Sequence, residues 1–363
     1  MFEIIFFILI IGYFFQLFIF TIGVQKKFPQ INEEELLTAT VIVAARDEEN
    51  NILRCLKSLD KLIYPDGKLE IILVDDRSND KTGEIIDNFI KGKERFKKII
   101  SKDPRGKLKG KTNALASGIE IAKGDIIFTT DADCCVKSTW VFKTASYYKE
   151  NVAMVNGFTT QESVNNFSGM QGIDFIYLLM IASSTINLGR PISCIGNNMS
   201  YLKKAYFEVG GYEALPFSVT EDFNLLMAIN RLGKYKILYP LDKETLVTSS
   251  PCENFKTLYR QKKRWAVGGL GVPLIGFLIL INGYLIYLCM FLLPFFYSSL
   301  SLYILIFKIA IDFFVLYPIH KRLGIEKNMK YFFVAEIYII IYVLTLPLLI
   351  AFNRKVIWKG REF

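Results

Sequence analysis

Short apolar runs alternate with helical segments over residues 40–130 of the chain. Each run has the length and composition of a buried strand, and each intervening segment repeats its apolar residues at helical spacing. The predicted strands are Thr40–Ala45, Glu70–Val74, Lys97–Ile100 and Ile126–Phe128. The predicted helices between them are Glu48–Leu59, Lys81–Phe89 and Lys111–Ala122. This succession predicts an α/β domain with a βαβ-wound, mainly parallel sheet.

The N-terminal residues form a long apolar run, Phe2–Val24, with a single charged residue, Glu3. At about 1.5 Å per residue, a helix of this length crosses a bilayer core of about 30 Å. A secretory signal peptide is the alternative, but no basic residue precedes the run and no small-residue cleavage site follows it. We therefore predict a transmembrane helix over residues 1–25.

The C-terminal part of the chain is apolar again over residues 270–352. We predict three transmembrane helices there, at Gly271–Leu292, Phe295–Tyr317 and Tyr331–Phe352, with a tight turn near residues 294–299 joining the first two. Residues 38–250 between the apolar ends form the predicted α/β domain.

Basic residues set the expected orientation of these helices. Lys26 and Lys27 follow the first span and, by the positive-inside rule, place the α/β domain in the cytoplasm, at a membrane of the bacterial inner-membrane type. The basic loop within residues 320–330 should be cytoplasmic too. The tail, residues 353–363, is equally basic through Arg354, Lys355, Lys359 and Arg361. Three spans after a cytoplasmic domain put this tail outside, so one segment is re-entrant or interfacial, and the sequence leaves open which one.

The composition agrees with a membrane protein. Hydrophobic residues make up 52% of the chain, with 30 Phe and 19 Tyr, and the excess lies at the two ends. The net charge of +9 indicates juxtamembrane Lys and Arg that face anionic lipid. Membrane lipids are therefore the expected partners, and binding to nucleic acid is not expected. The six cysteines lack the spacing of a disulfide framework or a zinc site.

Two further segments are suited to a membrane surface. Asn165–Pro191 is long, apolar and almost free of charge, and it is either a buried helix or a helix lying on the bilayer surface. Residues 251–269 combine aromatic side chains with basic ones, which predicts an amphipathic interfacial helix.

Charged residues recur where the predicted strands end. They are Arg46, Asp47 and Glu48 after the first strand, Asp75 and Asp76 after the second, and Asp131 and Asp133 just past the fourth. Ligands of open α/β sheets bind outside the carboxyl ends of the strands, so these side chains are expected at one rim. Two aspartates one residue apart can share Mg²⁺ or Mn²⁺, completed by water and phosphate oxygens, although a solvated acidic loop has the same pattern. The turn AARDEEN contains no glycine, which excludes a glycine-rich dinucleotide turn.

A family resemblance rests on seven motifs in order between Thr40 and Trp265. They are VIVAARDEENNI, ILVDDRSNDKT, GKTNALASGI, TTDADC, GNNMSYLKKAYFEVGGY, TED and QKKRW. The sequence resembles the membrane-integral family 2 glycosyltransferases, whose catalytic domain has the Rossmann-like GT-A fold. Ala116 departs from the family, in which many members have Asn at this position.

The resemblance implies roles for individual residues in binding a nucleotide-sugar donor. Asp76 is similar to the residue that hydrogen-bonds uracil, and Ala44, Arg46 and Glu48 would line the base pocket. Asp131 and Asp133, with Ala132 between them, resemble the metal and ribose ligands. Lys111 is a candidate phosphate contact or a solvated lysine at a helix start, and Trp140 is expected to pack rather than cover the sugar.

Glu221 and Asp222 precede an apolar pattern that ends at Gly233, which predicts a helix beginning at these carboxylates. A carboxylate at a helix N-terminus is favoured whatever its function, so capping alone is one interpretation. The match to the family's TED motif instead implies that Asp222 is the general base, with Glu221 beside it. Gln261, Arg264 and Trp265 match the family's QxxRW motif, which closes over the donor diphosphate and the acceptor.

The predicted function is inverting transfer of a sugar, from a donor that we take to be UDP-linked, to a membrane lipid or lipid-linked acceptor. A processive polysaccharide synthase shares QxxRW, but such enzymes usually have more transmembrane helices than the three predicted after the domain. A catalytically silent sensor of nucleotide sugars is a third interpretation, which the intact DAD, TED and QKKRW motifs disfavour.

Overall fold

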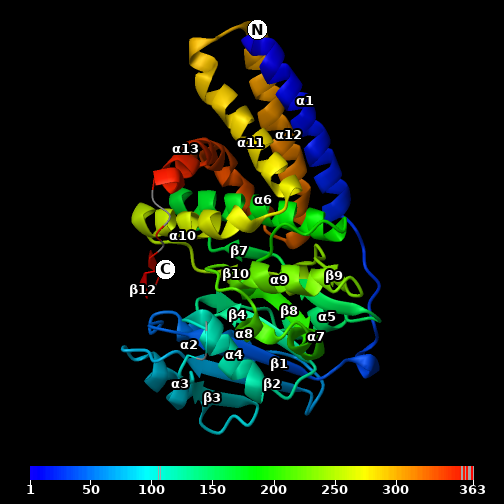
Figure 1. Ribbon diagram of the computed structural model, residues 1–363, viewed down its shortest axis with the longest axis vertical. Coiled ribbons are helices and arrows are strands. Elements are labelled where there is room, and N and C mark those ends of the chain that lie inside the picture. The colour runs from blue at the N-terminus through cyan, green and yellow to red at the C-terminus, as the bar shows by residue number, and fades with distance from the viewer. Residues whose placement is uncertain (105, 107, 353–354, 356, 359–360, 363) are drawn as a thin grey trace. The chain divides into compact units, whose positions relative to one another are not determined.

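The computed structural model describes residues 1–104, 106, 108–352, 355, 357–358 and 361–362 (Figure 1). Most of the predicted basic tail, including Arg354 and Lys359, lies outside the described residues. The chain divides into two compact units. The sheet unit comprises Lys27–Thr160 and Ser193–Ser250, and the helical unit comprises Met1–Lys26, Gln161–Ile192 and Pro251–Phe363.

A seven-stranded sheet in the order β3-β2-β1-β4-β8-β6-β9 forms the centre of the sheet unit. Its strands are β1 (Ala39–Ala45), β2 (Leu69–Asp75), β3 (Phe96–Ile100), β4 (Ile126–Asp131), β6 (Val152–Asn156), β8 (Met199–Leu202) and β9 (Lys236–Leu238). The first four strands are mutually parallel, as predicted, and β8 runs antiparallel to both β4 and β6. A smaller sheet joins β5 (Cys134–Cys135), β10 (Val247–Ser249) and β7 (Thr159–Gln161).

Seven α-helices belong to the described part of the sheet unit. They are α2 (Ile52–Asp60), α3 (Thr82–Ile90), α4 (Lys111–Ile121), α5 (Trp140–Ala145), α7 (Lys203–Glu208), α8 (Gly211–Ala214) and α9 (Glu221–Arg231). Short 3₁₀ turns occur at η1 (Glu33–Glu35), η2 (Gly196–Asn198) and η3 (Lys243–Thr245). The sheet core includes Phe128 and Trp140, whose rings meet edge to face at 5.4 Å. Trp140 is fully buried and donates from Nε1 to Asn198 Oδ1 at 2.9 Å, so it packs as expected.

The first helix of the sheet unit begins later than predicted, at Ile52 instead of Glu48. Asp47 has a left-handed backbone with φ of 51°, which interrupts a helix. The next N–H groups are held by side chains of another loop, because Glu48 N donates to Thr82 Oγ1 at 2.8 Å and Glu49 N donates to an oxygen of Asp80 at 3.0 Å. Side chains of that second loop therefore hold residues 48 and 49 in a loop that precedes α2.

The helical unit consists mainly of six α-helices. They are α1 (Phe2–Val24), α6 (Asn166–Asn187), α10 (Phe255–Gly268), α11 (Leu274–Leu292), α12 (Ser299–Leu323) and α13 (Phe332–Phe352). Short elements are η4 (Gly269–Gly271), η5 (Leu293–Phe295), η6 (Glu326–Tyr331), β11 (Ile357–Trp358) and β12 (Arg361–Glu362). In Figure 1, α1, α11 and α12 run side by side, and α6 contacts both α1 and α13. Helix α12 runs six residues beyond the predicted Tyr317 and ends where Gly324 adopts a left-handed backbone.

Among the described residues, five helical stretches are long and apolar enough to cross a membrane, including the four expected ones. The fifth is α6, which has a mean hydropathy of 1.3, against 2.1 or more for the others. Within its most apolar window 83% of α6 is buried inside the protein, against 28% for each of the other four. This burial favours the buried-helix interpretation of residues 165–191.

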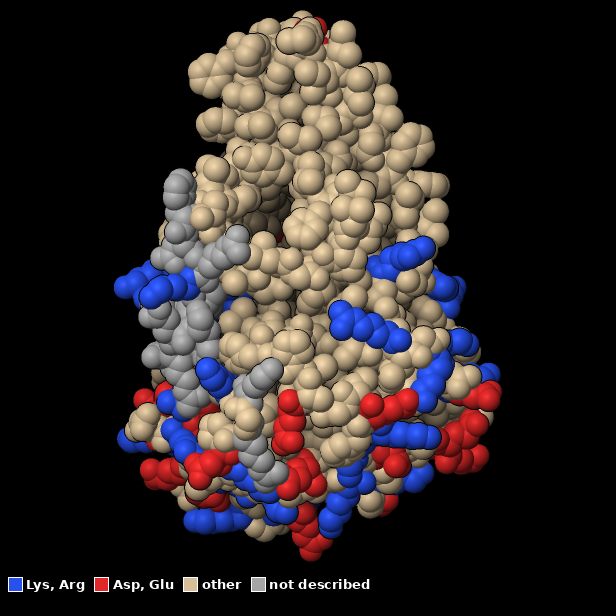
Figure 2. All heavy atoms as spheres, in the orientation of Figure 1, with Lys and Arg blue, Asp and Glu red and all other residues tan. Residues whose placement is uncertain are grey.

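The helical unit has an apolar exterior and a charged interior. Figure 2 shows that the face formed by α1, α11 and α12 carries few Lys, Arg, Asp or Glu. Inside, Lys308 of α12 lies 2.8 Å from an oxygen of Asp312 and 2.5 Å from an oxygen of Glu336 in α13. Tyr13 of α1 donates to the other oxygen of Asp312 at 2.7 Å. We call Lys308, Asp312, Glu336 and Tyr13 the core cluster.

Candidate active site

The strand register brings the predicted rim residues together. In the sheet, Ala44 of β1 pairs with Asp131 of β4 on one side, and Ala45 pairs with Asp75 of β2 on the other. Strand β4 continues three residues beyond the predicted Phe128, so Asp131 is its last residue instead of lying past its end, and Asp133 lies in the turn that leads to β5. The carboxyl ends of three parallel strands thus carry the candidate donor site.

Contacts within the protein hold Asp76 in place. Its side chain is buried, and one carboxylate oxygen accepts from Ser101 Oγ at 2.8 Å. Arg46 Nη1 donates to the backbone oxygen of Asp76 at 2.9 Å and lies 3.7 Å from its other carboxylate oxygen. A carboxylate fixed in this way is suited to accept a hydrogen bond from a base N–H group.

Negative charge accumulates around the DxD motif. Burial, followed by the charges of Asp131 and Glu48, raises the pKa of Asp133 to about 6 from 3.8. The backbone oxygen of Asp133 accepts from Arg54 at 2.8 Å, and Ala132 is buried between the two aspartates. The turn is therefore fixed by its backbone, while its carboxylates repel each other.

Lys111, at the start of α4, joins two motifs. Its Nζ lies 2.6 Å from Asp131 Oδ1 and 3.2 Å from Glu221 Oε1 at the start of α9. Burial lowers the pKa of Lys111, but the two carboxylates more than offset this and leave its pKa raised. The solvated-lysine alternative is wrong, because this ammonium group is ion-paired and its side chain is only 19% exposed.

The residues present fit a divalent cation that is completed by a ligand. Among the residues that the structure describes, no three His, Cys, Asp or Glu side chains form a metal-binding group. Asp131 and Asp133 provide two carboxylates in a strongly negative environment, and Mg²⁺ typically takes one or two protein carboxylates together with substrate phosphates. The site can thus complete a metal only with oxygens from water or a bound diphosphate.

Asp222 lies in the first turn of α9, beside Glu221. One of its oxygens accepts from the backbone N–H of Phe223 at 2.8 Å, so it satisfies one of the N–H groups that a helix start leaves without an internal partner. Gly196 lies directly against it, because a Cβ at position 196 would be 3.3 Å from both Cβ and Oδ2 of Asp222. Gly196 is the first residue of the GNNMSYLKKAYFEVGGY motif. The match of this motif to the family did not by itself indicate a role for the glycine.

The QxxRW residues belong to the helical unit, on α10. The Trp265 ring stacks on Phe175 of α6, with centroids 5.4 Å apart and planes 12° apart. Gln261 and Arg264 are half-buried on the same helix. The predicted contact of these three residues with the donor stays a prediction, since the other donor residues belong to the sheet unit.

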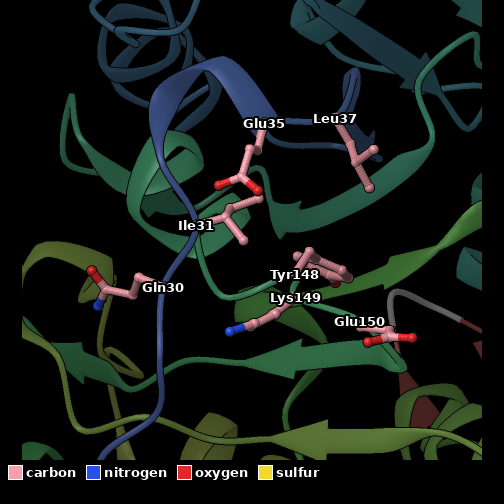
Figure 3. A pocket seen from close by; sticks show the side chains of 7 residues that line it. All are labelled: Gln30, Ile31, Glu35, Leu37, Tyr148, Lys149 and Glu150. Carbon is pink, nitrogen blue, oxygen red and sulfur yellow. The ribbon is translucent and has the colours of Figure 1, made fainter.

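A separate pocket of about 330 Å³ lies in the sheet unit (Figure 3). It is lined by Gln30, Ile31, Glu35, Leu37, Tyr148, Lys149 and Glu150. Its lining includes none of the rim residues, so this pocket is distinct from the candidate active site.

The sequence and the fold both match those of a known protein family. Residues 40–222 match the model of glycosyl transferase family 2, and the chain belongs to that family. A mannosyltransferase from Pyrobaculum calidifontis, solved with GDP-Man and Mn²⁺, has the same fold, with a TM-score of 0.61. That likeness covers 93% of this chain and 98% of the other at 16% identity.

Curated relatives have related but different activities. The probable glycosyltransferase YdaM of Bacillus subtilis is 30% identical over 67% of this chain and 58% of its own length. A beta-monoglucosyldiacylglycerol synthase of Nostoc is 26% identical over 72% of this chain and 56% of its own length. A poly-beta-1,6-N-acetyl-D-glucosamine synthase of Staphylococcus aureus is 28% identical over 67% and 57%. The chain therefore spans somewhat more than half the length of these relatives.

Proposed function

We propose that the enzyme transfers a single sugar from a UDP-linked donor to a hydroxyl group of a membrane lipid or lipid-linked acceptor, with inversion at the anomeric carbon. The observation that carries the proposal is the position of Lys111. Its ammonium group contacts both Asp131 of the DxD motif and Glu221 of the TED motif, at 2.6 and 3.2 Å. The proposed metal site and the proposed base, Asp222, therefore belong to one constellation.

Each rim residue has a chemical task in this scheme. Asp76 accepts a hydrogen bond from the base, in a pocket lined by Ala44, Arg46 and Glu48. Asp131 and Asp133 would hold Mg²⁺ or Mn²⁺, which supplies positive charge to the leaving diphosphate. Lys111 offers a cation near the same oxygens, and Arg264 of the QxxRW motif is proposed to contribute a second one.

Asp222 is the proposed general base. It takes the proton of the acceptor hydroxyl as that oxygen attacks the anomeric carbon in line with the leaving group. A bond from the acceptor oxygen to the anomeric carbon forms, and the bond from that carbon to the diphosphate oxygen breaks. The bonding electrons leave with UDP, and this single displacement inverts the carbon.

The lipid acceptor is supported by the helical unit. In the part of the chain that the structure describes, five stretches can cross a membrane by length and hydropathy, and the similar Nostoc protein is named for a glucosylated diacylglycerol. Similarity to a poly-N-acetylglucosamine synthase keeps processive synthesis as the second candidate. The product separates them, because single transfer yields a lipid carrying one added sugar and processive synthesis yields a polymer.

The proposed test is UDP release by detergent-solubilised enzyme with mixed membrane lipids, followed by mass spectrometry of the lipids. The expected result is UDP release that depends on Mn²⁺ and a lipid heavier by one sugar. Asp131→Asn and Asp133→Asn should lose Mn²⁺-dependent binding of UDP in calorimetry while keeping the fold. Unchanged UDP affinity in both variants would remove the metal assignment, and a polymeric product would replace single transfer by processive synthesis.

The catalytic domain is proposed to face the cytoplasm at an inner membrane. Lys26 and Lys27 follow α1, as the positive-inside rule requires for that orientation. A cysteine introduced at the exposed Asp66 should resist a membrane-impermeant thiol reagent in intact cells and react after permeabilisation. Labelling of the peptide that contains residue 66 in intact cells would contradict the proposed orientation.

A further inference from the structure

Helix α6 contains one charged residue in 22, Asp174, and that residue is fully buried. Four polar or aromatic residues of α6 follow one another at spacings of four, three and one residues: Phe167, Gln171, Asp174 and Phe175. In a helix, this spacing places them along one face. An ionisable group inside an apolar helix requires a partner or a task.

All four side chains contact a single segment, residues 252–265, which contains the QKKRW motif. The Phe167 ring meets Phe255 edge to face at 4.7 Å. The Gln171 amide bonds both ways to the backbone of Cys252, donating to its oxygen at 3.1 Å and accepting from its N–H at 2.9 Å.

The other two contacts reach the motif itself. Asp174 forms an ion pair with Lys262, and Phe175 stacks on Trp265 at 5.4 Å. One face of α6 thus contacts α10 and the residues just before it, from residue 252 to residue 265.

The ion pair is enclosed on every side that the structure describes. Lys262 is 6% exposed, and its Nζ lies 4.5 Å from the centroid of the Trp265 ring and 5.1 Å from that of Tyr342. Tyr342 of α13 donates to the second oxygen of Asp174 at 2.9 Å. Lys262 and Asp174 therefore link α10 to both α6 and α13.

Stability does not account for such a pair. A well-packed apolar pair of similar volume is often as stable as a buried ion pair, or more stable. An ion pair differs in accepting one geometry, because any rotation of α10 would leave both charges unpaired. Successive residues of a helix are about 100° apart, so holding Lys262 and Trp265 also fixes the directions of Gln261 and Arg264.

We propose that Asp174 and Lys262 are positioning residues that set the rotation of α10 and thereby aim Gln261 and Arg264. This inference rests on the proposed function, in which Arg264 acts on the donor diphosphate. Helix α6 is then the template on which the QKKRW helix is oriented. Neither residue of the pair is proposed to contact the substrates.

The test replaces the ion pair with apolar residues, Asp174→Leu together with Lys262→Met. We expect the melting temperature and UDP affinity to stay close to those of the wild type, while kcat falls at least tenfold. Lys262→Arg, which keeps a cation opposite Asp174, should retain at least a third of kcat. Lys256→Met on the exposed side of α10 is the matched control and should leave kcat unchanged.

A second readout does not depend on turnover. A cysteine placed at Gln261 should react with a thiol reagent at least threefold faster in the apolar double variant than in its parent, measured on the peptide by mass spectrometry. If the wild type transfers no sugar, the proposed function fails, and this labelling still tests the positioning.

A folded double variant with wild-type kcat and an unchanged labelling rate would overturn the positioning role. Should the double variant not fold, Asp174→Asn gives the same two measurements, because its amide oxygen can still accept from Tyr342. Wild-type kcat and labelling in that variant would overturn the inference equally.

Discussion

Two clusters in this protein each place one lysine between two carboxylates, and they differ in what surrounds them. At the rim, Lys111 lies between Asp131 and Glu221, and the Asp131 side chain is 35% exposed. In the core cluster, Lys308 lies between Asp312 and Glu336 and is fully buried. A tyrosine hydroxyl completes the core cluster, whereas further carboxylates crowd the rim.

The difference separates a site from a structural link. The core cluster joins α1, α12 and α13, and its charges find their partners within the protein. The rim retains excess negative charge beside solvent, which favours a bound cation, and such a cation would in turn attract a diphosphate. An ion pair alone therefore does not indicate a functional site. Carboxylate charge that is not neutralised by a neighbouring cation is the better indicator.

The largest effect is expected from Asp222→Asn at the rim. Transfer should fall by about 10²- to 10⁴-fold, the contribution of general base catalysis. Stability should hardly change, because Asn satisfies helix N-terminal N–H groups about as well as Asp. UDP release, UDP affinity and melting temperature are the measurements, with the exposed Asp66→Asn as control. Wild-type turnover in Asp222→Asn would leave Glu221 or a substrate group as the next candidate base.

Matched lysine substitutions test the comparison directly. Lys308→Met strands two buried carboxylates and should cost about 3–5 kcal/mol of stability. Lys111→Met should cost less, about 1–3 kcal/mol, because it leaves only Glu221 buried without its cation while the 35% exposed Asp131 can turn towards water; transfer should nevertheless fall. Thermal unfolding in detergent measures both. Equal losses of stability would show that the rim lysine is as structural as the core one.

Gly196→Ala should affect chemistry more than folding. Its Cβ would lie 3.3 Å from Asp222, so the carboxylate must shift by a few tenths of an ångström. We expect a loss of kcat of up to about tenfold with a nearly unchanged melting temperature, since small misplacements of a catalytic group are costly. Gly12→Ala is the control, because a Cβ at position 12 would meet open space. Gly92 also has open space around it, but its positive φ would strain an alanine, so it is not a suitable control.

The smallest effect concerns pH in metal-free protein. Asp133 has a folded-state pKa of about 6, above its ordinary 3.8, so the folded protein binds this proton more tightly than the unfolded chain. Stability from this group is therefore lost as pH rises from about 4 to 6 and is constant above. With a chelator present, the melting temperature of the wild type should fall across this window relative to Asp133→Asn. Parallel curves would contradict the raised pKa.

Much of the fold could be predicted because its signals are local. The first four strands and α4 follow from apolar runs and helical spacing, and their bounds differ from the prediction by three residues or fewer. The start of α2 was wrong because distant side chains, those of Asp80 and Thr82, cap the loop before it. The antiparallel β8 interrupts the parallel sheet and is supplied by a later part of the chain.

The contacts within the candidate site could be predicted less well from the sequence than the fold could. Motif order indicated its members, but the ion pairs of Lys111 depend on Glu221, which is remote along the chain. Asp174 and Lys262 are equally remote from each other, and neither α6 nor α10 signals the pair by itself. Such contacts follow from tertiary structure, which periodicity does not encode.

The interleaving of the two units has a consequence for how the chain is made. The sheet unit cannot complete its sheet until β8 and β9 have been synthesised, and both follow α6. Helices α10 and α13, which contact α6, come later still. At about 5–20 residues per second, synthesis from the start of α6 to the end of α13 takes about ten to forty seconds. For the part of that interval before Lys262 is made, the apolar α6 carries a carboxylate without its cation. We therefore expect a membrane surface or a chaperone to protect α6 during synthesis.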